Sequence, residues 1–299
     1  MSTLASGTAD LDRLQDEEAV DAVPRDRFWV RLRTHRSAMF GVGVLVLFAL
    51  ASLIGPLLDH NDPVRQDLAN AFLPPSPAHP LGTDDLGRDE LVRLLYGGRL
   101  TLLVGFGAVA IGFLIGVPLG ALSGYLGGWL DMLTQRVVDV ILAFPNILLA
   151  IALVAALGPG LRNVIISVGI TSIPAFVRLV RASALSIREL PYVEAARALG
   201  VSDWRILLRH VIPNSLAPVI VQATLQLGAA ILVAAGLGFL GLGVQPPTPE
   251  WGTMLGSSRQ FIFSDSILVT VPGLAIFGAV LAFNLLGDGL RDALDPRLR

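Results

Sequence analysis

Long runs of residues without charge constrain the fold of this chain more than any other feature of its sequence. Such runs lie at 37–58, 100–130, 140–161, 163–177, 212–249 and 266–287. About 20 apolar residues in a helix cross the hydrocarbon core of a bilayer. A helix also satisfies all of its backbone hydrogen bonds within lipid. The runs therefore predict an all-α membrane protein with six transmembrane helices.

Two of the runs have unusual lengths. The fourth, 163–177, is short, and we expect Arg178 and Arg181 at its end to reach the lipid headgroups. The fifth, 212–249, is longer than one span needs, so its length alone allows one span or two. With one span, the Gly-rich tract 236–244 becomes an irregular extension, which is tolerated at membrane depth only where protein or water satisfies its backbone.

The distribution of arginine favours six spans over seven. Arginines crowd before the first run and follow the last, at Arg25, Arg27, Arg31, Arg33 and Arg36, then at Arg291, Arg297 and Arg299. Cytoplasmic segments carry an excess of basic residues. Six spans place both groups in the cytoplasm, whereas seven would place the second group outside. We therefore expect both termini to be cytoplasmic.

This topology divides the chain into successive segments. We predict a cytoplasmic tail at 1–36, a first transmembrane helix at 37–58, an extracytoplasmic segment at 59–99, a five-helix core at 100–290 with a cytoplasmic loop at 184–213, and a cytoplasmic tail at 291–299. A second polar segment, 245–265, should lie outside. The first two dozen residues are acidic and lack the basic and apolar regions of a secretory signal, so a disordered tail is expected there.

Two residue types are absent from the chain, and each absence excludes a kind of chemistry. There is no cysteine, which rules out disulfides, thiolate metal sites and cysteine nucleophiles. There is no lysine, so a phosphate-binding P-loop cannot be completed. If ATP drives this protein, another subunit must hydrolyse it.

One polar stretch, EAARALGVSDWRILLRHVIPN at 194–214, separates two of the apolar runs. Pro191 suits the first turn of a short helix, and Glu194 lies near the positive end of its dipole. Gly200 then allows a positive φ and a sharp turn.

The second half of the stretch predicts another short helix. Ser202 or Asp203 can cap a helix at 204–210, and Pro213 marks the entry to the fifth span. The result is a helix–turn–helix elbow, residues 191–213, along the cytoplasmic face. Its small alanines would let another protein approach closely, although an ordinary amphipathic connector has the same spacing.

The elbow resembles the EAA loop of the membrane subunits of binding-protein-dependent ABC importers. That pattern is Glu-Ala-Ala, three residues, Gly, nine residues and Ile-x-Leu-Pro. The chain has the matching residues Glu194, Ala195, Ala196, Gly200 and Pro213, whereas His210 and Ile212 replace the usual Ile and Leu.

Other segments resemble the C-type subunit of dipeptide and oligopeptide permeases. They are RFWVRLRTHRSAMFGVGVLVLFAL, HPLGTDDLGRDELVRLLYGGRLTLLVG, DVILAFPNILLAIAL and GLGFLGLGVQPPTPEWGTML. The resemblance implies the type I ABC importer permease fold. It also implies a location in a bacterial or archaeal plasma or inner membrane.

The resemblance assigns the elbow to docking an ATPase. Glu194, Ala195, Ala196 and Gly200 should lie in a cleft of that subunit, with Arg197 and Trp204 at the rim. The implied partners are a second homologous permease subunit, two ABC ATPases, an extracytoplasmic solute-binding protein and a peptide substrate. No cofactor is expected in this chain, because ATP and Mg²⁺ would bind the ATPases, and no nucleic acid is expected as a partner.

Two clusters of charged residues allow other interpretations. His79, Asp84, Asp85 and Asp89 could suggest a metal site, but neighbouring glycines favour turns and helix caps. Arg136 and Asp139 are three residues apart at the start of the third span, where an ion pair is favoured over a proton relay.

Other functional classes find less support in the sequence. A proton-coupled secondary transporter would need more buried carboxylates. Ser186 and Ser215 do not form a Ser-His-Asp arrangement, so no enzyme activity is expected. The small residues of GVPLGALSGYLGG, in the second run, should serve helix packing. Nickel chelates, glutathione and oligosaccharides remain alternative substrates within the importer class.

Overall fold

The computed structural model describes residues 25–58 and 61–294, and these are helical apart from loops and one isolated bridge. The helices are α2 (Arg25–Thr34), α3 (Arg36–Leu58), η1 (Leu68–Asn70), α4 (Glu90–Leu126), α5 (Gly128–Leu142), α6 (Asn146–Leu157), α7 (Leu161–Ile187), α8 (Pro191–Ala198), α9 (Asp203–Ile206), η2 (Leu207–Val211), α10 (Ile212–Phe239), α11 (Trp251–Ser258), η3 (Arg259–Phe261) and α12 (Ile267–Leu294). The expected disordered segment 1–24 lies outside the described residues.

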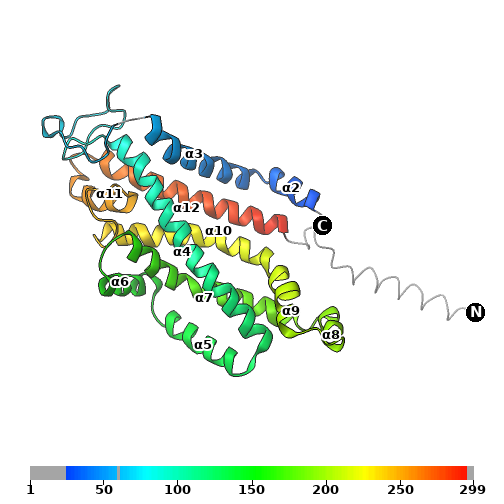
Figure 1. The fold of residues 1–299 in the computed structure, drawn as a ribbon. Helices are drawn as coiled ribbons and strands as arrows, with labels where there is room; N and C mark the ends of the chain where they lie inside the picture. The colour runs from blue at the N-terminus through cyan, green and yellow to red at the C-terminus, as the bar shows by residue number, and fades with distance from the viewer. Residues whose placement is uncertain (1–24, 59–60, 295–299) are drawn as a thin grey trace, which may run out of the picture.

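Five helices are long and apolar enough to cross a membrane, namely α3, α4, α7, the run from α9 to α10, and α12. A sixth span is obtained when α5 and α6 are counted together. Figure 1 shows α3, α4, α10 and α12 lying side by side as a bundle. The expected all-α membrane fold is confirmed.

A stripe of glycines brings α4 against α7. Gly112, Gly116, Gly120 and Gly124 recur every four residues along α4. A Cβ atom at Gly120 would lie 2.6 Å from the Val177 carbonyl oxygen, and one at Gly124 would lie 2.6 Å from that of Arg181. Only glycine permits this approach of the two backbones. The packing role predicted for GVPLGALSGYLGG is confirmed.

Helix α4 begins ten residues before the second uncharged run. Asp89 caps it by accepting a hydrogen bond from the backbone N–H of Val92 at 3.0 Å. Two charged residues of the first turn, Glu90 and Arg93, are buried. Arg93 donates to the Pro63 carbonyl oxygen at 2.9 Å. The uncharged run 100–130 therefore predicted the end of α4 better than its start. The charged residues near the start, Glu90 and Arg93, are buried against other parts of the protein.

The third uncharged run is divided into two helices instead of forming one continuous span. Helices α5 and α6 meet at 90° across residues 143–145. Pro145 has no backbone N–H to continue a helix, and it restricts the residue before it.

Arg178 and Arg181 do not lie at the end of the fourth helix, where the sequence placed them, and their reach to the headgroups stays a prediction. Helix α7 continues to Ile187, so both side chains lie along it. Arg178 pairs with Asp139 at 2.8 Å and Arg181 with Asp131 at 2.6 Å, both aspartates being on α5. The sequence predicted an ion pair of Arg136 with Asp139 within one helix, but Asp139 pairs instead with Arg178 of α7.

The Gly-rich tract ends α10, and the chain then folds back. The tract is helical up to Phe239, and Gly241 adopts a φ of +77° in the turn that follows. Within the predicted polar segment 245–265, α11 packs against α4, α10 and α12. Trp251 at its start is 2% exposed. This segment is thus partly built into the bundle.

The elbow, the end of α12 and the helix α2 lie at one end of the bundle, and the loop 61–89 with α11 lies at the other (Figure 1). Part of the predicted tail 1–36 is helical, since α2 packs Leu32 against Ala293 of α12. His35 Nε2 lies 3.0 Å from Asp292 Oδ2 at the same junction. The side of the membrane on which each end lies remains a prediction.

Candidate functional site: the elbow

The first helix of the elbow packs against the bundle core through two small apolar side chains. Pro191 opens α8, as the sequence predicted. Val193 is fully buried in the core, and Ala196 packs against the same core from a half-buried position. Glu194 and Ala195 point outward and are exposed. The Glu-Ala-Ala motif therefore leaves two of its three residues exposed on the surface.

Gly200 ends this helix through its backbone conformation. Its φ is +79°, and its N–H donates to the Arg197 carbonyl at 3.0 Å. The Val201 N–H donates to the Ala196 carbonyl at 3.1 Å. This pair of bonds is a Schellman motif, which favours glycine at the left-handed position. A Cβ atom here would meet nothing within 4 Å, so the requirement concerns φ and not space.

The second helix of the elbow differs from the expected separate helix at 204–210. Residues Asp203–Phe239 form one helical run that includes a π-helical turn, Leu207–Val211. The Ile212 N–H donates to the Leu207 carbonyl five residues back. Pro213, which lacks an N–H, is accommodated just after this turn. It therefore does not interrupt the entry to the fifth span.

A three-residue network fixes the elbow to the end of α4. The hydroxyl of Tyr125 donates to Asp203 Oδ1 at 2.8 Å. Nη2 of Arg197 donates to the same hydroxyl at 3.3 Å, and its guanidinium lies 5.6 Å from the centre of the Tyr125 ring. This hydrogen bond raises the pKa of Arg197 above its usual value. Ser202 occupies the cap position of α9 without a side-chain capping bond.

The network adds a second role for Arg197, because its exposed side chain also binds Tyr125 of α4, and its predicted place at the rim of an ATPase cleft stays a prediction. Sequence reasoning missed Tyr125 and Asp203 as partners. The available signal was Tyr125 itself, a polar aromatic residue among small residues at the end of an uncharged run.

The outer surface of the elbow combines apolar and acidic groups. Leu199 is 85% exposed and Trp204 61% exposed. The side chain of Glu194 makes no hydrogen bond or ion pair with any other described residue. Behind this surface, Asn214 donates to the hydroxyl of Tyr192 at 3.1 Å, which links α8 to the first turn of α10. The elbow is thus a rigid projection with free side chains at its tip.

The charged residues near the opposite end serve turns and caps, as predicted. His79 Nδ1 lies 2.8 Å from Asp89 Oδ2. Asp84 accepts from the backbone N–H groups of Leu86 and Arg88 and pairs with the Arg88 side chain at 2.6 Å. In residues 25–58 and 61–294, no three acidic or histidine side chains are grouped as metal ligands.

Comparison with known proteins decides the family of the chain. Residues 116–299 match the model described as "Binding-protein-dependent transport system inner membrane component". Residues 24–75 match the "N-terminal TM domain of oligopeptide transport permease C". The chain belongs to this family of transport-system membrane components. Its N-terminal part has the form found in the C-type oligopeptide permeases.

Curated relatives of this permease cover nearly its whole length. It is 50% identical over 269 residues to the dipeptide transport system permease protein DppC of Alkalihalophilus pseudofirmus, covering 90% of this chain and 88% of that protein. It is 48% identical over 277 residues to the glutathione transport system permease protein GsiD of Pectobacterium atrosepticum, covering 92% of each.

A solved structure supports the fold assignment. An inward-facing form of the MetNI methionine ABC transporter contains a chain that aligns with a TM-score of 0.55 and 22% identity. The alignment covers 68% of this permease and 97% of that chain. This likeness concerns the fold alone, and it agrees with the expected ABC importer permease architecture. The permease is a multi-pass membrane protein.

Proposed function

We propose that this permease forms half of the translocation path of an ATP-driven importer for short peptides, and that its elbow docks an ATPase subunit. The observation that carries the docking role is the elbow's geometry, a rigid projection whose Glu194, Leu199 and Trp204 side chains are free at the tip. Family membership supports import with a binding protein. The names of the dipeptide and glutathione permeases support peptides as cargo.

The connections of the elbow suggest how docking moves the spans. The elbow continues into α10 without a break, and Tyr125 ties it to α4. Closure of a docked ATPase would therefore displace both helices together. Such a displacement would bias two arrangements of the bundle, open to the inside or to the outside.

The remaining subunits of this importer follow from what the chain lacks. The sequence has no lysine for a P-loop, so two separate ATPase subunits bind ATP and Mg²⁺. A second homologous permease completes the path, and an extracytoplasmic binding protein delivers the peptide. The complex would lie in a bacterial inner membrane with the elbow in the cytoplasm.

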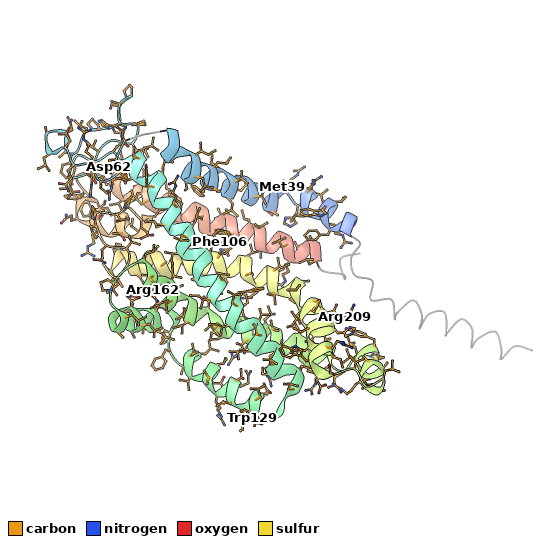
Figure 2. The ribbon with its side chains drawn as sticks, in the orientation of Figure 1. Met39, Asp62, Phe106, Trp129, Arg162 and Arg209 are labelled. Atoms are coloured by element: carbon orange, nitrogen blue, oxygen red, sulfur yellow. The ribbon has the colours of Figure 1, made fainter. Side chains whose placement is uncertain are left out.

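A pull-down from mild detergent tests the docking role. We expect the tagged wild-type chain to recover an ATPase, and Glu194→Lys to lose it. Arg162→Glu is the matched charge reversal, because Arg162 is exposed at the end of the bundle away from Arg209 of the elbow (Figure 2). Equal recovery by both variants would overturn docking through Glu194.

An uptake assay tests the energy source. Peptide uptake into cells should survive an uncoupler while ATP is held constant. Collapse of uptake under that treatment would instead support a proton-coupled transporter.

A further inference from the structure

Two opposite charges are exposed partway along two of the helices within the bundle. Arg178 of α7 and Asp139 of α5 form an ion pair of 2.8 Å, and their side chains are 55% and 54% exposed. By helical rise, Asp139 lies about 17 Å along α5 and Arg178 about 13 Å before the end of α7. The neighbouring pair of Arg181 and Asp131 is less exposed, at 32% and 19%.

The exposure of the outer pair indicates what covers this face. Ionisable groups within spans face the bundle interior or a water-filled cavity, because their exposure to hydrocarbon is costly. Asp139 is not in the interior, and its short side chain cannot reach far along the helix. This face of α5 and α7 is therefore expected to border water or another subunit of the complex rather than lipid tails.

The Arg178 side chain also forms part of a pocket at the bend between α5 and α6. The pocket has polar walls from Asn146, Thr171 and Gln226 and apolar walls that include Phe144 and Leu149. It thus combines residues of the bend, α7 and α10. The Gln226 amide group donates to Ser172 Oγ at 3.1 Å, which fixes the side chain and leaves its carbonyl oxygen as an acceptor.

We propose that this pocket binds the C-terminal carboxylate of a short peptide during translocation, with Arg178 as its ligand; this rests on the peptide cargo of the proposed function. Only one N–H of the Arg178 guanidinium donates to Asp139. The other donors of that group suit a carboxylate, which arginine binds through two parallel bonds.

The other pocket residues suit the rest of the same ligand. The carboxamides of Asn146 and Gln226 match the peptide group, which donates and accepts hydrogen bonds. These features are common to peptides of any sequence, so the pocket would recognise the class and leave side-chain choice to other components.

Photo-crosslinking in the purified, nanodisc-embedded complex tests this site. The probe is a dipeptide of alanine and benzoylphenylalanine, used as the free acid and as the C-terminal amide. The wild type should label about tenfold more with the acid, since a hydrogen-bonded charge pair contributes on that scale. Arg178→Gln should abolish the preference, whereas Asp139→Asn should keep it because the guanidinium remains. Arg181→Gln, the matched arginine of the inner pair, should also keep it.

The outcomes separate this site from the proposed function. Import of radiolabelled dialanine by the wild-type complex tests the peptide cargo, and its failure would reject that cargo. If dialanine is imported but the acid and amide label equally in the wild type, the pocket is not a carboxylate site. If Arg178→Gln and Asp139→Asn lose the preference for the acid equally, the ion pair only holds α5 against α7, and Arg178 does not bind the peptide carboxylate.

Discussion

Tyr125 donates a hydrogen bond of 2.8 Å to Asp203, and this contact joins residues 78 positions apart in sequence. It connects the last turn of α4 to the first residue of the elbow's second helix. Because Arg197 bonds to the same hydroxyl, one oxygen atom holds both helices of the elbow. Its removal should loosen the elbow without changing the surface that a partner meets.

Tyr125→Phe should therefore weaken coupling more than docking. We expect the ATPase to be recovered normally, while the ratio of peptide imported to ATP hydrolysed falls severalfold. The lost hydrogen bonds should also lower the stability by about 1 kcal/mol. Uptake and ATP hydrolysis in proteoliposomes measure the ratio. Tyr192→Phe is the control, since its hydroxyl accepts from Asn214 of α10 and makes no bond to α4, and an equal fall in both variants would contradict the prediction.

Substitutions at Gly200 should follow backbone conformation rather than size. At a φ of +79°, asparagine is tolerated better than alanine, and alanine should destabilise the turn by about 1 kcal/mol. Gly200→Pro should abolish uptake, because proline cannot adopt this φ and would lose the bond to the Arg197 carbonyl. Uptake at matched expression gives the order Gly, Asn, Ala, Pro. Normal uptake by Gly200→Pro would disprove the role of the turn.

The elbow shows which parts of a site can be predicted from sequence. Pro191 and Gly200 act through the local backbone, so their residue types predict the helix start and the turn. The Tyr125 contact depends on how α4 packs beside α9, which no local pattern encodes. The π-helical turn was missed for a related reason. Pro213 suggested that a helix begins there, but the helix continues past it because the preceding turn has a hydrogen bond between residues five apart, from Ile212 to Leu207.

The fold shows the same division between local and tertiary causes. Uncharged runs located α3, α7, α10 and α12, because hydrocarbon excludes charge. They misplaced the start of α4, where Glu90 and Arg93 are buried against protein. The pairing of Arg178 and Asp139 was also missed, because it joins two helices across 39 positions in sequence, which no local pattern encodes.

The glycine stripe on α4 should be intolerant of even one methyl group. Gly120→Ala would place a Cβ atom 2.6 Å from a backbone oxygen of α7, and overpacking of this kind destabilises by about 1–3 kcal/mol. Gly43→Ala is the matched control in α3, since a Cβ atom there meets nothing within 4 Å. Thermal unfolding in detergent should show a lower midpoint for Gly120→Ala only. Equal midpoints would mean that α4 and α7 can separate without loss of stability.

Glu250 should be the residue that holds α11 in place. Its buried carboxylate accepts from the N–H groups of Gly252 at 3.0 Å and Thr253 at 2.9 Å, and from the Thr101 hydroxyl on α4 at 2.9 Å. All three partners are donors, so the amide NH₂ of Glu250→Gln would face at least one of them. An unsatisfied or repelled buried donor costs about 1–3 kcal/mol.

Hydrogen exchange of α11 measures this effect directly. Glu250→Gln should speed the exchange of the Gly252 and Thr253 amides by at least tenfold while leaving α7 unchanged. Gln245→Glu is the inverse control, because Gln245 is exposed and its amide donates only to the Gly241 and Gly243 carbonyls of the preceding turn. Unchanged exchange in Glu250→Gln would mean that packing of Trp251 against Phe48 of α3 and its hydrogen bond to Leu94 of α4, rather than the buried carboxylate, fix this segment to the bundle.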